Sequence, residues 1–171
     1  MSIAQKLGQS DQIAEQIKTK SLTFTVGEAT VTLRVRVPVK REMEAMLEQI
    51  ANPAPARVEA LYETLSKSLR DSIATGGEDF LKTINAEKEV LKVTDTDMIL
   101  DGTSLRSMAN LTAMWETKVQ AYFHLLQSET GEPITETYDE IAAEFPEQVI
   151  RQMVEEIEAV IRPTYKSAKK N

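Results

Sequence analysis

A single stretch near the start of the chain, residues 21–38, alternates apolar and polar side chains with the period of a β-strand. It reads SLTFTVGEATVTLRVRVP, and Gly27 and Glu28 separate its two apolar series. Side chains on a strand point to opposite faces in turn, so each series lies on one face. A glycine at the first central position is what a two-residue type II′ turn requires. The stretch therefore predicts a β-hairpin.

The turn also fixes the register of this hairpin. Val26 pairs with Ala29 across the two-residue turn, and two residues further along each strand Phe24 lies opposite Val31. In this register all the apolar side chains share one face, while threonines and arginines take the other. An isolated two-stranded hairpin is marginal in water. We therefore expect helices, or strands of another subunit, to cover the apolar face.

The rest of the chain shows helical patterns, because its apolar residues recur at spacings of three and four. Helices are expected over residues 39–52, 55–75, 80–84, 104–130, 137–145 and 146–162. Gly76 and Gly77 predict a loop, residues 90–93 could form a brief strand, and Asp101 with Gly102 predicts a turn. The expected core stripe of the longest helix comprises Leu105, Met108, Leu111, Trp115, Val119, Tyr122, Phe123 and Leu126.

These patterns predict an α+β fold, mostly α, in which the N-terminal β-hairpin packs on a helical bundle. The length of 171 residues suits one core, so we expect a single domain over residues 1–171. Within it, residues 1–20 are expected to form a mobile or docking helix, 21–38 the hairpin, 39–163 the helical region and 164–171 a loose tail.

Composition and charge narrow the classes of function. The chain has no cysteine, which excludes a disulfide framework, a thiol nucleophile and a Cys-based metal site. Its net charge is -7, and an acidic surface repels phosphate backbones, so we expect no nucleic-acid partner. No apolar run approaches the roughly 18 residues of a membrane span, and the N-terminus lacks the apolar core of a signal peptide. We expect a cytoplasmic protein without membrane association.

Residues suited to catalysis or metal binding are few. The only histidine is His124, within an apolar part of the longest helix, where a structural role is favoured. Asp95, Asp97 and Asp101 come nearest to an oxygen-ligand loop, although the spacing of a calcium-binding EF-hand is missing. Structural caps or turns are the favoured roles of these aspartates, with a cation site or a small metal-dependent enzyme as the alternative. We expect no enzyme activity, no cofactor and no metal.

The first helix after the hairpin offers a candidate partner-binding surface. Met43, Met46, Leu47 and Ile50 form one stripe on it. Methionine is flexible and can repack against varied partners. Core packing competes with this role, more so for Leu47 and Ile50 than for the two methionines.

Three stretches carry a resemblance to a known family: LTFTVGEATVTLRVRVP (22–38), VKREMEAM (39–46) and YDEIAAEFPEQVIRQMVEEIEAVIRP (138–163). In their order along the chain they resemble the small tail assembly chaperones of long-tailed bacteriophages. The resemblance covers most of the chain in pattern and includes no catalytic motif.

This resemblance implies a non-enzymatic protein that works by reversible binding. Such chaperones coat the tape measure protein and help to recruit tail tube subunits before leaving the finished virion. The expected partners are therefore the tape measure protein and the tail tube protein, with a homo-oligomer as a further possibility. The alternative is a structural phage tail or connector protein that is retained in the virion.

Overall fold

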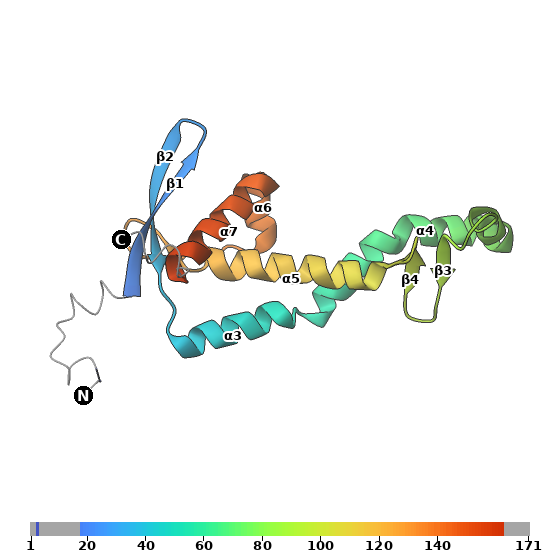
Figure 1. The fold of residues 1–171 in the computed structure, drawn as a ribbon, viewed down its shortest axis with the longest axis horizontal. Coiled ribbons are helices and arrows are strands. Elements are labelled where there is room, and N and C mark those ends of the chain that lie inside the picture. The colour runs from blue at the N-terminus through green and yellow to red at the C-terminus, as the bar shows by residue number, and fades with distance from the viewer. Residues whose placement is uncertain (1–2, 4–17, 163–171) are drawn as a thin grey trace. The chain divides into compact units, whose positions relative to one another are not determined.

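The structure is a computed structural model that describes residue 3 and residues 18–162 (Figure 1). The elements in chain order are β1 (Thr19–Val26), β2 (Ala29–Arg36), α3 (Lys40–Ala51), α4 (Pro55–Ile84), β3 (Leu91–Val93), β4 (Met98–Leu100), β5 (Thr103–Ser104), α5 (Leu105–Phe123), β6 (Leu126–Gln127), α6 (Tyr138–Glu144) and α7 (Glu147–Ile161). The predicted α+β fold, mostly α with an N-terminal antiparallel hairpin, is confirmed.

The chain divides into two compact units, each of which is described by itself. Unit 1 comprises residues 1–48 and 118–171, and unit 2 comprises residues 49–117. Whether residues 1–171 form a single domain depends on whether the two units unfold together, so the single domain stays a prediction. The predicted tail 164–171 lies outside the described residues, as does the predicted N-terminal helix except for residues 3 and 18–20. Of these, Thr19 and Lys20 belong to β1, so the hairpin begins earlier than predicted.

The hairpin in unit 1 has the predicted register. Val26 pairs with Ala29 and Phe24 with Val31. Gly27 has a φ of 60°, and Asp101 is the only described non-glycine residue with a positive φ. A positive φ at the first central residue alone is what a type II′ turn requires, so the predicted turn is confirmed. β6 adds a third strand on the other side of β2.

The apolar face of the hairpin is only partly covered. Leu22, Phe24 and Val35 are buried, whereas Val26 is 44% exposed and Val31 is 51% exposed. The expectation that the whole face is covered is therefore wrong near the turn. α7 contacts both strands, but Phe24 of β1 is buried while its partner Val31 of β2 is open, so at this level the cover is more complete over β1 than over β2.

The helices of unit 1 near the C-terminal end follow the predicted signals. Thr137 caps α6 in a capping box with Glu140, and Pro146 directly precedes α7. The buried residues of α7 recur at spacings of three and four, as on one face of a helix, and are Ile150, Met153, Val154, Ile157 and Ile161. Lys118 and Tyr122 of α5 both bond the carboxylate of Glu158 in α7.

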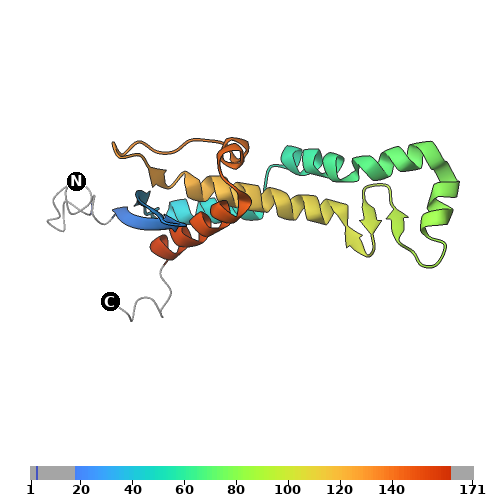
Figure 2. The same cartoon turned by 90° about the horizontal axis from the view of Figure 1, so that it is seen from above.

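In unit 2, the predicted break at Gly76 and Gly77 divides α4 into two helical stretches, as the non-helical backbone of Gly77 shows. Gly77 has a φ of 55° and a ψ of -140°, which no L-residue in a helix adopts. The helix changes direction there, as Figure 2 shows. The predicted strand within residues 90–93 is β3, and it pairs with β4 in a second three-stranded sheet.

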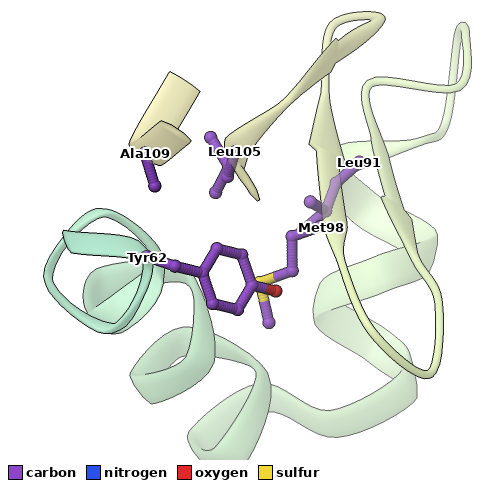
Figure 3. Packing of buried hydrophobic residues seen from close by; sticks show 5 residues of the cluster. All are labelled: Tyr62, Leu91, Met98, Leu105 and Ala109. Carbon is purple, nitrogen blue, oxygen red and sulfur yellow. The ribbon is translucent and has the colours of Figure 1, made fainter. Parts of the chain in front are cut away.

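The core of unit 2 forms around the ring of Tyr62. Figure 3 shows this ring among the side chains of Leu91, Met98, Leu105 and Ala109, which come from β3, β4 and α5. The guanidinium of Arg106 lies 4.1 Å from the centre of the same ring, a cation–π distance.

Two parts of the prediction for α5 are wrong. Met108 and Leu111 are exposed, and the stripe is continued by Ala109 and Ala113, both at 0% exposure. Alanine buries little area by itself but lets a neighbouring backbone come close. The positions of the large apolar side chains therefore did not predict the whole buried face of α5. The helix also ends at Phe123, before the predicted stop at Gly131, and Leu126 lies in β6.

Candidate functional site

Asp97 has the structural role that the sequence favours for it. Its Oδ1 accepts the backbone N–H groups of Met98 at 2.8 Å and Arg106 at 3.0 Å, and its Oδ2 accepts the hydroxyl of Ser104. The Ser104 Oγ accepts the N–H of Ser107 at 2.9 Å. Together these contacts satisfy donors at the N-terminus of α5 that have no partner inside the helix.

The neighbouring aspartates and His124 have separate surroundings in the structure. Asp101 accepts a hydrogen bond from Lys88 at 2.8 Å and forms the predicted turn with Gly102, while Asp95 is exposed. His124 Nε2 lies 2.8 Å from the carbonyl oxygen of Glu136, which fits a structural role. Among residues 3 and 18–162, no group of three His, Asp or Glu side chains is placed to hold a metal ion.

Unit 1 contains an apolar groove of about 570 Å³. It is formed by β2, β6, the end of α5, the segment 128–136, α6 and α7. Its apolar lining residues are Val31, Leu33, Phe123, Leu126, Ile134, Ile141, Phe145 and Met153. This set is called the apolar groove below.

Part of this lining is open to solvent. Val31 is 51% exposed and Phe145 is 37% exposed, although both are large apolar side chains. The rings of Phe123 and Phe145 have centroids 6.3 Å apart and form a tilted aromatic pair at the groove. Exposed apolar side chains gathered in a concave site are typical of surfaces that bind a partner.

The charged residues that line the apolar groove are mostly acidic. Glu129, Glu136, Glu140 and Glu144 contribute carboxylates, against a single cation from Arg34. The backbone N–H and the hydroxyl of Thr137 bond Glu140 and lower the pKa of its carboxyl. All four glutamates are exposed. The groove is thus apolar inside and anionic around its mouth.

The predicted partner-binding stripe on α3 does not form one open surface. Met46 is buried at 9% exposure, Met43 and Ile50 are half-buried, and Leu47 is 37% exposed. The expectation that Leu47 would be more buried than the methionines is wrong, because both Met43 and Met46 are less exposed than Leu47. The role of this stripe in binding stays a prediction.

Sequence reasoning did not identify the apolar groove as a site. Its residues come from five elements and from positions between 31 and 153 in the sequence, so no local pattern unites them. The one available signal was the apolar face of the hairpin, which includes Val31 and Leu33 and which a single hairpin cannot bury by itself.

Comparison with known proteins gives no relative: no protein-family model matches the chain, and no curated protein or solved structure matches it. Within the described part of the chain, no helix combines the length and the apolar character needed to cross a membrane.

Proposed function

We propose that this chain is a non-enzymatic tail assembly chaperone of a long-tailed bacteriophage, which binds the tape measure protein and helps to recruit tail tube subunits. It acts in the host cytoplasm and leaves before the virion is complete. The three stretches that resemble this family support the proposal, and so does the apolar groove of unit 1.

The apolar groove is the observation that carries the proposal. A tape measure protein is a long, apolar-rich chain, and exposed apolar patches beyond a few hundred Å² drive aggregation. A temporary cover for such a chain needs open apolar surface of its own together with a charged exterior. Val31 and Phe145 supply open apolar surface at the groove, and the surrounding glutamates keep the same region hydrated.

Co-expression with the tape measure protein of the same phage tests the proposal. The tape measure protein is expressed alone and together with this chain, and its amounts in the soluble and insoluble fractions are measured. We expect this chain to move it into the soluble fraction. A tape measure protein that stays insoluble beside the wild-type chain would contradict the chaperone function.

A groove variant and a matched control locate the binding surface. Val31→Asn with Phe145→Asn removes the two most exposed apolar side chains of the groove and should abolish the rescue. Leu65→Asn with Val93→Asn changes two exposed apolar residues of unit 2 and should leave it intact. Circular dichroism checks that both variants fold. Full rescue by the groove variant would show that the binding surface lies outside the groove. The α3 stripe would then be the next candidate.

The stripe on α3 needs a different variant from the obvious one. Met46→Asp would place a carboxylate at a buried position, so a loss of rescue would not separate unfolding from lost binding. Leu47→Asp changes the most exposed member of the stripe and avoids this ambiguity.

Mass spectrometry of purified virions tests whether the protein leaves the particle. A chaperone should be absent or present in trace amounts only. An abundance comparable with that of tail proteins would contradict the proposal and support the structural alternative.

A further inference from the structure

We infer that the apolar groove takes an extended segment of a partner protein, which pairs as an added strand with the open edge of β2 and carries Lys or Arg beside its apolar residues. The inference rests on the binding role proposed for the groove. Beyond that role, it specifies the backbone conformation and the charge of the segment that the groove binds.

β2 has a strand partner along only part of one edge. On one side β1 pairs with its whole length. On the other side β6 pairs with Arg34 and Val35, and within the described residues no strand continues that side toward the hairpin turn. An open edge of this kind is a template for a further strand.

The backbone groups that face the open edge belong to Thr30 and Thr32. The N–H of Arg36 donates to the carbonyl oxygen of Leu125 at 2.7 Å, so the backbone groups of Arg36 point to the β6 side. Every second residue of a strand directs its N–H and C=O to the same edge. Those of Thr30 and Thr32 are therefore directed to a strand that would continue the line of β6.

The open edge borders the apolar groove. Val31, Thr32 and Leu33 of β2 all line it. A strand added beside them would present every second side chain to the groove, so alternate residues of the occupant should be apolar. A helix satisfies its own backbone groups, so it would gain nothing from those of Thr30 and Thr32, whereas an extended segment would pair with them.

The charges that line the groove indicate which residues should accompany the apolar residues of the occupant. Four glutamates and one arginine line the groove, and none of the four has an ion-pair partner among the residues that the structure describes. Lys or Arg on the occupant would gain attraction at the mouth of the groove. Acidic residues there would be repelled, and such like-charge contacts strongly disfavour a wrong partner.

Two synthetic peptides of equal apolar content test the charge preference. One is acetyl-KVTVTVK-amide and the other is acetyl-EVTVTVE-amide, each with a fluorophore, and binding to the full chain is measured by fluorescence anisotropy at low salt. We expect the lysine peptide to bind at least about tenfold more tightly than the glutamate peptide, and the difference to shrink as salt is added. Equal affinities, or no binding of the lysine peptide, would overturn the inference.

Charge reversal on the protein supplies the matched control. Glu129→Lys with Glu144→Lys changes two exposed groove residues and should reverse the preference toward the glutamate peptide. Glu87→Lys with Glu155→Lys makes the same change in net charge at exposed positions outside the groove and should leave the preference unchanged. An equal effect of both variants would show that only net charge matters and would contradict a charge-selective groove.

Backbone methylation of the lysine peptide tests strand addition without changing the protein. N-methyl groups on the two threonines block one edge of the peptide, and N-methyl groups on the valines block the other. We expect one pattern to abolish binding and the other to be tolerated. Amide exchange of Thr30 and Thr32 should slow on saturation, while that of Val31, which faces β1, should not change. Equal effects of both patterns would overturn strand addition.

Two further outcomes separate this inference from the proposed function. Rescue of the tape measure protein without binding of the lysine peptide would overturn the inference and leave the chaperone function standing. Self-association of the chain that the lysine peptide disperses would show that the occupant is a second copy and would also overturn it.

Discussion

At the scale of single residues, Asp97 is the side chain on which the start of α5 depends most. Asp97→Ala removes the acceptor of three donors, and leaving such groups unsatisfied costs about 1–3 kcal/mol. We expect a free energy of unfolding lower by about that amount in urea denaturation. Asp95→Ala, at an exposed neighbour, should change it by no more than about 0.5 kcal/mol. Equal effects of the two substitutions would contradict the capping role.

The same residue predicts a pH dependence. Burial raises the pKa of Asp97, but the hydrogen bonds from Ser104 and from the N–H groups of Arg106 and Met98 together bring it below the ordinary value of 3.8. A lowered folded-state pKa contributes stability that is present above the unfolded pKa and is lost as the pH falls through the folded one. Asp97→Asn should therefore lose less stability than the wild type between about pH 5 and pH 2. Equal acid sensitivity would contradict this assignment.

At the scale of elements, the hairpin should show a graded response to truncation. Phe24→Ala removes a buried ring and should cost about 3–5 kcal/mol. Val26→Ala lies on the same face of the same strand, but it is 44% exposed and should cost about 0.5 kcal/mol. Thermal unfolding of both variants checks this. A melting temperature of the Phe24 variant within a degree of the wild type would refute its burial.

Local chemistry explains which elements could be predicted. The hairpin register follows from Gly27 and a period of two, α6 begins at its Thr137 cap, and Gly77 breaks α4, since each signal acts within a few residues of the chain. The buried face of α5 and the apolar groove depend instead on contacts between distant segments. Ala109 gives no apolar signal in the sequence, and Phe145 reads as core although it is 37% exposed.

At the scale of the whole molecule, we expect one cooperative unfolding transition. α5 supplies Leu105 to the buried residues of unit 2 and Val119 to those of unit 1, and helix formation is cooperative along its length. Phe24→Ala in unit 1 and Leu91→Ala in unit 2 should therefore lower the same calorimetric transition. Two transitions, each sensitive to only one of these substitutions, would contradict the predicted single domain.

The open edge of β2 would expose many proteins to runaway polymerisation, because one hairpin can extend the sheet of the next molecule without limit. Here the edge lies beside four carboxylates on a chain whose net charge is -7. The net negative charge opposes the approach of one copy to another, most strongly at low ionic strength. We therefore expect this charge to slow polymerisation through the open edge of β2, and added salt to weaken that protection.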